Sequence, residues 1–128
     1  MKNLSYADSL RLLDEALKQY KHLLEKLATG NRESANEDLL NIIVLLLKAL
    51  LMLNNYPALG IADPTYLAAI ATDRNVLTLQ QYGKIVETIL NLKMGIFKEE
   101  FLNTVKVLVE EASKRDPLIR LQTSLTKY

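Results

Sequence analysis

The amino-acid sequence predicts an all-α fold, an up-and-down bundle of four longer helices and two short ones. The first observation is the run from Leu39 to Leu53, LLNIIVLLLKALLML, in which only Asn41 and Lys48 are not apolar. A helix that is apolar nearly all round must be surrounded by other elements, so this run predicts the central helix of the bundle. Composition is the second observation, because four Gly, three Pro and no Trp favour helix over strand. The third is that capping residues precede most of the stretches with helical spacing.

Length, charge and cysteine content limit the classes of function. The chain of 128 residues has the usual length of one domain, and we expect a single domain over residues 1–128. As a helix the apolar run spans only about 22 Å, too short for a hydrocarbon core of about 30 Å, and the first residues lack the apolar stretch of a secretory signal. We therefore expect a cytoplasmic protein without membrane contact. The net charge of +1 gives no general attraction for nucleic acid, and the absence of cysteine excludes disulfides, thiolate metal sites and cysteine nucleophiles.

The first helix is expected to begin at Ser5, an N-cap residue with Asp8 three positions on, and to end before Gly30. Its apolar residues recur at steps of four and three along one stripe. These are Tyr6, Leu10, Leu13, Leu17, Tyr20, Leu24 and Leu27.

The central helix is expected to start at about Ala35, because Ser34 and Glu37 form the capping-box pattern S-x-x-E. The link to the first helix is short, so the two helices are predicted to be antiparallel neighbours. Lys48 lies near the helix end, where its charged tip can reach solvent. Asn41 is a buried amide on this interpretation and needs partners, so we expect it to fix the register against a neighbouring helix or a second subunit.

A loop over residues 54–63 precedes the third helix. Asp63 followed by Pro64 predicts a capped start, since proline suits the first helical position. This short helix is expected to run to about Ala71 and to bury Leu67 and Ile70.

Thr78 and Gln81 repeat the capping-box spacing and predict the start of the fourth helix. Its expected core stripe consists of Leu79, Tyr82, Val86, Ile89 and Leu90. Gly83 either weakens this helix by roughly 0.5–1 kcal/mol relative to alanine or marks close packing against a neighbour, and the sequence leaves both explanations open.

The fifth helix is expected beyond Gly95, with acidic residues near its start and basic residues at its end, as the helix dipole favours. Its apolar stripe consists of Phe97, Phe101, Val105, Leu108 and Ala112. Asp116 and Pro117 predict a last short helix over about 117–126, which would dock on the bundle or on a partner.

Few residues offer chemistry. His22 is the single histidine and is predicted to face solvent, so a di-metal bundle site with two Glu-x-x-His pairs is excluded. The acidic pairs at positions 99–100 and 110–111 would hold Mg²⁺ only if they met another acid such as Glu87. The sequence contains no glycine-rich phosphate loop and no nucleophile motif. We therefore expect no metal, no cofactor and no catalytic residue.

Basic residues gather towards the C-terminus, where two interpretations remain open. Lys114, Arg115, Arg120 and Lys127 would be the phosphate or nucleic-acid contacts if the chain binds such ligands. The favoured interpretation is a helix-end charge cluster, because aromatic residues are not interleaved and acids lie nearby.

The order of elements resembles the HEPN helical domains found beside minimal nucleotidyltransferases in prokaryotes. The resemblance covers most of Ser5 to Ala112 and lies in LLDEALKQYKHLLEKL, LLLKALLML, YLAAIA, KIVETILNLK and FLNTVKVLVEEA. Ribonuclease members of that family carry an arginine followed after four to six residues by histidine. This chain has no such pair, because Arg11 is too far before His22. The resemblance therefore implies a non-catalytic member that forms dimers or binds a partner.

Three functional hypotheses follow, of which we favour a non-catalytic interaction module that forms a homodimer or binds a partner protein. The high apolar content of 49% supports this hypothesis, because the last helix and the loop add apolar residues beyond one bundle core. The second hypothesis is a nucleotide- or nucleic-acid-binding helical protein. The third is an enzyme or toxin with a site around Tyr82, Glu87 and Glu110.

Overall fold

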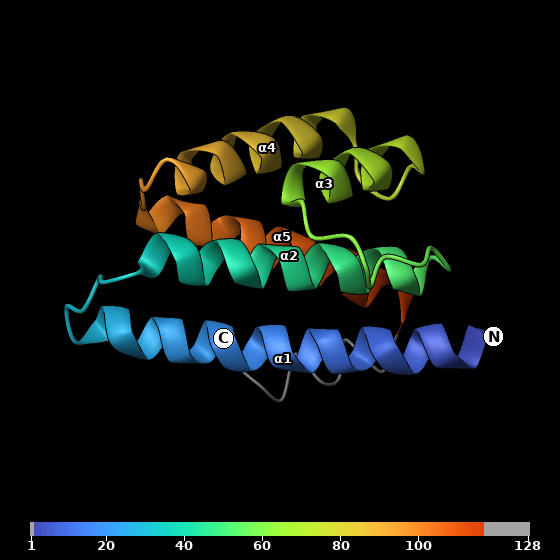
Figure 1. The fold of residues 1–128 in the computed structure, drawn as a ribbon, viewed down its shortest axis with the longest axis horizontal. Helices are drawn as coiled ribbons and strands as arrows, with labels where there is room; N and C mark the ends of the chain where they lie inside the picture. Colours follow the sequence, from blue (N-terminus) through green and yellow to red (C-terminus); the bar gives the residue numbers. More distant parts are fainter. Residues whose placement is uncertain (1, 117–128) are drawn as a thin grey trace.

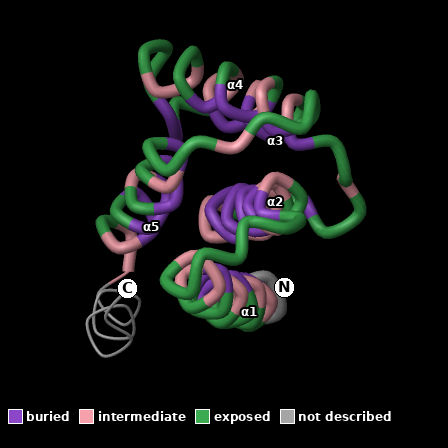
Figure 2. Tube along the Cα trace, turned by 90° about the vertical axis from the view of Figure 1, so that its left-hand side faces the viewer, coloured by how far each residue is buried: buried purple, intermediate pink, exposed green. Residues whose placement is uncertain are grey.

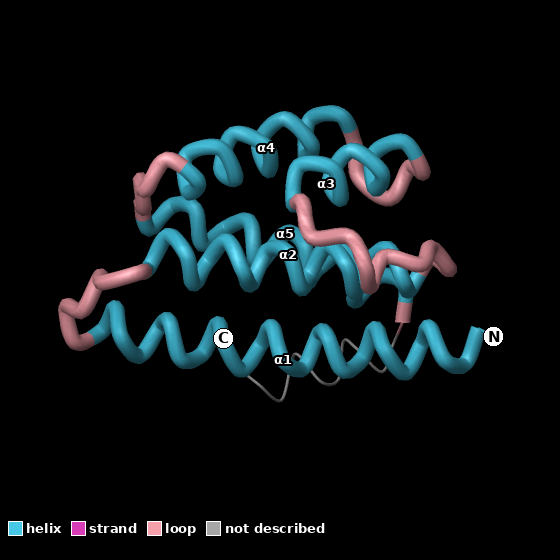
Figure 3. The backbone as a smooth tube through the Cα atoms, in the orientation of Figure 1, coloured by secondary structure: helices cyan, strands magenta, loops and turns pink. Residues whose placement is uncertain are grey.

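The computed structural model describes the backbone of residues 2–116 and the side chains of residues 6–116. Over this part of the chain the protein is all-α, as predicted, with five α-helices, one 3-10 helix and no strand (Figure 3). The helices are α1 (Lys2–Ala28), α2 (Ala35–Leu53), α3 (Pro64–Asp73), α4 (Leu79–Lys93), the 3-10 helix η1 (Glu99–Leu102) and α5 (Asn103–Arg115). The expected last helix over about 117–126 lies outside the described residues.

The helices form three layers, with α2 in the middle (Figure 1). α1 packs mainly against α2 on one side, and α5 lies next to α2 in the middle layer. α3 and α4 contact each other and form the third layer, on the side of α2 away from α1 (Figure 2). None of the helices in the described ranges is long and apolar enough to cross a membrane.

The prediction of α2 as the central helix is confirmed. Its buried positions surround most of the helix axis, and several of them are completely inaccessible to solvent. They are Ala35, Leu39, Ile42, Ile43, Leu46, Leu47, Ala49, Leu50, Leu51 and Met52. Burying an aliphatic side chain of this kind contributes about 1.5–3 kcal/mol, so α2 is the main source of hydrophobic stabilisation.

One side of α2 stays open, and the expectation of a buried amide at Asn41 is wrong. Asn41 is exposed, and its Nδ2 donates a hydrogen bond to Oε1 of Gln19 in α1 at 2.7 Å. Nearby, Nζ of Lys26 lies 2.8 Å from Oδ2 of Asp38. The Asn41 contact is exposed and the Lys26–Asp38 contact is partly buried, and both join α1 to α2. Asn41 therefore links neighbouring helices without a large desolvation cost.

Three predicted helix starts differ in their outcome. α1 begins at Lys2, so Ser5 lies within the helix and is not its N-cap. Ser34 precedes α2 as predicted, but it adopts a left-handed conformation with φ 61° and its side chain makes no capping hydrogen bond. At α4 the predicted capping box is complete, because the hydroxyl of Thr78 accepts from the backbone of Gln81 while the side chain of Gln81 accepts from the backbone of Thr78.

α3 begins at the predicted residue, and its N-cap is as expected. Oδ1 of Asp63 accepts a hydrogen bond from the backbone N–H of Thr65 at 3.0 Å, and Pro64 occupies the first turn. Leu67 is fully buried. The fifth predicted helix begins as η1 before it continues as α5.

Contacts between distant segments close both ends of the helical layers. The guanidinium of Arg32 lies 5.1 Å from the ring centre of Phe97, which joins the α1–α2 link to the α4–η1 link. Arg74, at the end of α3, lies 4.6 Å from the ring centre of Tyr56 in the long loop. The hydroxyl of Tyr6 donates a hydrogen bond to the carboxylate of Asp116, which raises the pKa of Tyr6 and joins α1 to the residue after α5.

Candidate interaction surface

α4 carries apolar residues on two opposite faces. The inner face packs on the core through Ile85, Thr88, Ile89 and Leu92, all of which are buried. The other face carries a second line of residues at helical spacing, which we call the outer stripe: Leu79, Gly83, Val86 and Leu90. The predicted core stripe of the fourth helix was therefore partly wrong, because it combined residues from both faces.

The two leucines of the outer stripe are largely exposed to solvent although they are apolar. Leu79 is 78% exposed and Leu90 is 49% exposed, whereas Val86 is half-buried against the core. In Figure 2 the outer side of α4 is drawn as exposed and intermediate, in contrast to the buried α2. Exposed apolar residues in one contiguous line are typical of interaction sites, whereas scattered single ones are ordinary.

Gly83 lies in the middle of the outer stripe with open space around it. A Cβ atom built at Gly83 would meet no heavy atom within 4 Å. Close packing of Gly83 against another helix of this chain is thereby excluded within the described part. What remains is a helix-weakening glycine that leaves a gap in an apolar surface.

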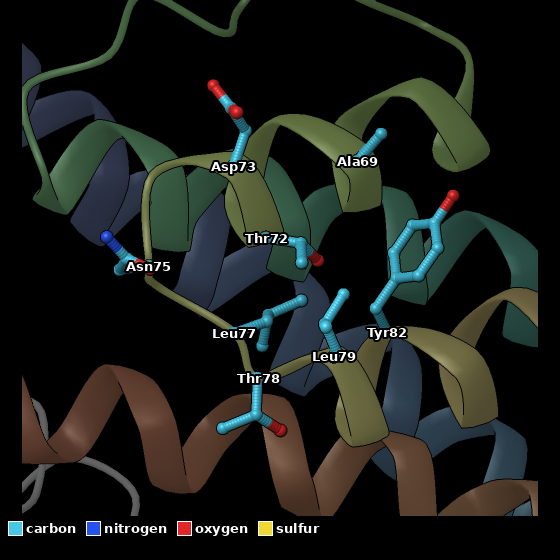
Figure 4. A pocket seen from close by; sticks show the side chains of 8 residues that line it. All are labelled: Ala69, Thr72, Asp73, Asn75, Leu77, Thr78, Leu79 and Tyr82. Carbon is cyan, nitrogen blue, oxygen red and sulfur yellow. The ribbon is translucent and has the colours of Figure 1, made fainter.

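A hollow of about 510 Å³ is lined by residues of α3, of the α3–α4 link and of the first turn of α4, and we call it the α3–α4 hollow. Figure 4 shows Leu79 and Tyr82 of α4 on one side of this hollow and Thr72 of α3 on the other. The carboxylate of Asp73 points away from these side chains. The remaining lining residues are Ala69, Asn75, Leu77 and Thr78. Tyr66 is also largely exposed on α3, so both helices of the outer layer carry an exposed large apolar side chain.

A second concavity, the α4–α5 groove, has a volume of about 650 Å³. Its floor contains the buried hydroxyls of Thr88 and Thr104, whose oxygens lie 3.5 Å apart. Glu87 and Glu110 both line this groove, whereas Tyr82 lines the α3–α4 hollow instead. The structure thus brings together only two members of the hypothetical enzyme site.

The walls of the α4–α5 groove carry three glutamates, Glu87, Glu100 and Glu110, and these acids alternate with lysines and amides. The lysines and amides that line the groove are Gln81, Lys84, Asn91, Lys98, Asn103 and Lys106. In the described ranges no group of three or more histidine, aspartate or glutamate side chains is arranged to hold a metal ion. His22 is exposed, as predicted, and lines a shallow depression together with Lys18, Gln19 and Asp38.

The basic residues at the end of α5 are engaged within the fold. Arg115 donates to the carboxylate of Glu111 at 3.1 Å, to the Glu111 carbonyl at 2.7 Å, to the Val76 carbonyl at 3.3 Å and to Oδ1 of Asn54 at 3.4 Å. Lys114 pairs with Glu111 at 3.2 Å. A phosphate ligand would compete with these contacts, while Arg120 and Lys127 lie outside the described residues.

Glu111 is the centre of this network and is almost entirely buried. Besides Lys114 and Arg115 it accepts a hydrogen bond from Nε2 of Gln81 at 3.0 Å. Burial is the largest single effect and raises the pKa of Glu111, but the hydrogen bonds from Gln81, Arg115 and Lys114, together with the charge of Lys114, outweigh it and lower the pKa. Since Gln81 also caps α4, the network holds α4 to α5.

Comparison of the chain with protein-family models, with curated proteins and with solved structures gives no significant match. Its class is therefore defined by the structure alone, an all-α protein with an exposed apolar surface on its outer layer. Sequence reasoning missed that surface, although a signal was present. Apolar residues of the fourth helix occupy both the 79, 83, 86, 90 positions and the 85, 89, 92 positions, and a helix with two such lines has more apolar surface than one core contact can cover.

Proposed function

We propose that this protein is a non-catalytic interaction module that binds another protein chain through the outer surface of α4 and α3. The observation that carries the proposal is the outer stripe, a line of apolar residues along a helix whose opposite face already fills the core. Removing such a surface from water is the main favourable term in protein association.

The chemistry of the described residues supports this proposal over the alternatives. The α4–α5 groove has mixed charges and the acids on its walls do not form a metal-binding group, which does not favour an enzyme site. Lys114 and Arg115 make contacts within the fold, which does not favour a phosphate site.

The resemblance to HEPN domains belongs to the same proposal. A non-catalytic member of that kind would be an up-and-down bundle that forms dimers or binds a partner, and it would lack the arginine–histidine pair, as this chain does. The central α2 and the antiparallel α1 and α2 are compatible with this arrangement.

Site-specific photocrosslinking tests the proposal directly. A photoreactive phenylalanine derivative is placed at position 90, on the outer stripe, and in a separate variant at position 22, where His22 is exposed on α1. Protein adducts are expected at position 90 and not at position 22, in the purified protein or in extracts of the cells that express it. Equal yields at the two positions, or no adduct at position 90, would contradict an interaction surface on α4.

A further inference from the structure

We infer that the α4–α5 groove binds a small zwitterion, a molecule with one amino group and one carboxylate and the size of an amino acid or a short peptide. Three features carry this inference. The two helices are held apart over a cavity, the floor of the cavity contains two buried hydroxyls, and its walls carry charges that do not pair with each other. The outer stripe plays no part in it.

The groove exists because α4 and α5 both pack on α2 but scarcely on each other. Two side-chain contacts bridge them, one from Gln81 to Glu111 and one between Thr88 and Thr104. Thr88 lies seven residues after Gln81, and Thr104 lies seven residues before Glu111, so the helices run antiparallel with matched levels. The volume between them, about 650 Å³, lies within the range of about 300–1,000 Å³ that is typical of small-molecule sites.

The floor of the groove has hydrogen-bonding capacity that the described chain does not use. Thr88 is 7% exposed and Thr104 is 8% exposed, and both line the groove. Their oxygens lie 3.5 Å apart, well beyond the usual O–H···O distance of about 2.7–2.8 Å, and neither hydroxyl has another partner among the described residues. Two hydroxyls carry two hydrogens and share one contact, so at least one hydrogen is free for a ligand oxygen. An acceptor that enters the groove would satisfy this buried donor.

The two walls carry opposite charges at nearly the same levels. Lys84 on α4 lies within two residues of the level of Glu110 on α5, about 3 Å along the helix axis. Glu87 on α4 lies within one residue of the level of Lys106 on α5, about 1.5 Å along the axis. None of these four side chains forms an ion pair with any described residue. The groove thus presents a cation and an anion on facing walls at two successive levels.

A zwitterion suits facing charges of this kind better than a cation or an anion does. Its ammonium can contact a glutamate on one wall while its carboxylate contacts a lysine on the other. A metal ion or another pure cation would also meet the lysines of the walls, and a phosphate would also meet the glutamates. Between the two levels of charge, Ile85 and Val107 face each other and give the groove an apolar section, which suits an aliphatic side chain.

Beyond the threonine pair the walls become neutral, which favours a ligand with a peptide bond. Asn91 and Asn103 line this section of the groove. Nδ2 of Asn91 donates to the carbonyl of Glu87 at 2.9 Å, which leaves its Oδ1 as an acceptor for a ligand N–H. The free threonine hydrogen is a donor for a ligand carbonyl. We therefore expect a dipeptide to bind more tightly than a single amino acid.

Titration of the isotope-labelled full chain with glycyl-L-leucine, followed by amide NMR spectra, tests this site. Shifts are expected in α4, η1 and α5, with half-saturation at about 1 mM because charges at an open groove each contribute little. N-acetylglycyl-L-leucine lacks the ammonium and glycyl-L-leucinamide lacks the carboxylate, so each is expected to bind about fivefold more weakly. L-Leucine keeps both charges without the peptide bond and is expected to bind about threefold more weakly.

Three variants and a control locate the binding groups. T88V/T104V removes both hydroxyls and keeps their shape, so the free energy of unfolding should stay the same or rise while affinity for glycyl-L-leucine falls about fivefold. Lys106→Glu should weaken binding about tenfold, since it replaces an attraction by a repulsion, and K106E/E87K should restore it by reversing the pair in place. Lys21→Glu is the control, because it makes the same charge change at an exposed residue of α1 that does not line the groove.

Several results would overturn the inference. They are the absence of shifts at about 20 mM dipeptide, equal binding of the blocked compounds, unchanged binding by T88V/T104V, and an equal loss in Lys21→Glu and Lys106→Glu. Equal binding of L-leucine and the dipeptide would support the zwitterion site with a free amino acid as its ligand. The outcome of photocrosslinking at position 90 is independent of all these measurements, so the groove and the outer stripe succeed or fail separately.

Discussion

Replacement of Glu111 by alanine is expected to lower the free energy of unfolding by about 2–3 kcal/mol. The Glu111 side chain is only 12% exposed and accepts hydrogen bonds from three side chains. Its loss leaves the amide of Gln81 without its acceptor and leaves the charge of Arg115 without its carboxylate. The effect is therefore larger than that of an ordinary surface substitution.

The magnitude can be divided among the three partners. Lys114 is 65% exposed, so its ion pair contributes only a few tenths of a kcal/mol. The hydrogen bond from Gln81 contributes about 1 kcal/mol. Arg115 is largely buried and loses a charged partner, which costs roughly 1–2 kcal/mol rather than more because it keeps its contacts with the carbonyls of Val76 and residue 111.

Urea unfolding followed by circular dichroism measures this difference, with Lys114→Ala as the matched control. The control removes the exposed partner and should cost less than about 0.5 kcal/mol, while Glu111→Ala should shift the midpoint with an unchanged slope. If the two variants are equally stable, or if Glu111→Ala lies within about 0.5 kcal/mol of the natural protein, the network does not stabilise the fold as described.

Three further predictions concern pH, capping and glycine. The lowered pKa of Glu111 means that its stabilisation is complete above its ordinary value of 4.5 and is lost as the pH falls from there through the lowered folded value, so stability between about pH 6 and pH 3 should decline less steeply in Glu111→Gln. Thr78→Ala should cost about 1 kcal/mol in urea unfolding, whereas Ser34→Ala should cost less than about 0.3 kcal/mol because Ser34 makes no capping hydrogen bond; equal losses would contradict the capping geometry. Gly83→Ala should stabilise the protein by about 0.5–1 kcal/mol in urea unfolding, because a Cβ atom at this position meets no heavy atom within 4 Å; an unchanged or lower stability would contradict the open space around Gly83.

Capping patterns in the sequence predicted the first residues of α2 and α4 correctly, but they did not predict which cap forms side-chain hydrogen bonds. Thr78 and Ser34 both stand three residues before Gln or Glu, yet only Thr78 forms the reciprocal bonds. Ser34 differs because the short link after α1 turns the backbone at this residue into the left-handed region, which moves its hydroxyl away from the first turn of α2. The capping-box pattern covers only four residues, so it carries no information about the conformation of the turn that precedes the helix.

The exposed face of α2 can be predicted from the spacing of its polar residues. Glu37, Asn41 and Lys48 follow one another at steps of four and seven, so the polar residues of this helix share one face. The structure leaves that face the least covered, and Lys48 donates from there to the carbonyl of Leu59 at 2.9 Å. Asn41 considered alone does not reveal this polar face, whereas the three residues together do.

The candidate surface was harder to predict because both lines of residues on α4 have helical periodicity. Periodicity identifies a helix and its apolar faces, but the choice between Ile89 and Leu79 for the core depends on where α2 and α3 lie. That position is a tertiary property, since α4 meets α2 through contacts between residues far apart in the sequence. The hydrogen bond from Asn36 to the carbonyl of Leu92, at 3.2 Å, is one example.

The contacts of Arg115 have a consequence for how the chain folds during its synthesis. This side chain joins the residue after α2, the turn before α4 and the last turn of α5, which are 61, 39 and 4 positions apart along the chain. Since synthesis proceeds from the N-terminus, α1 and α2 can pair early, but the polar groups of Asn54 and Val76 lack this partner until a residue 61 and 39 positions later has been made. A ribosome stalled before codon 115 would therefore hold a nascent chain that still lacks the hydrogen bonds from Arg115 to Asn54 and Val76.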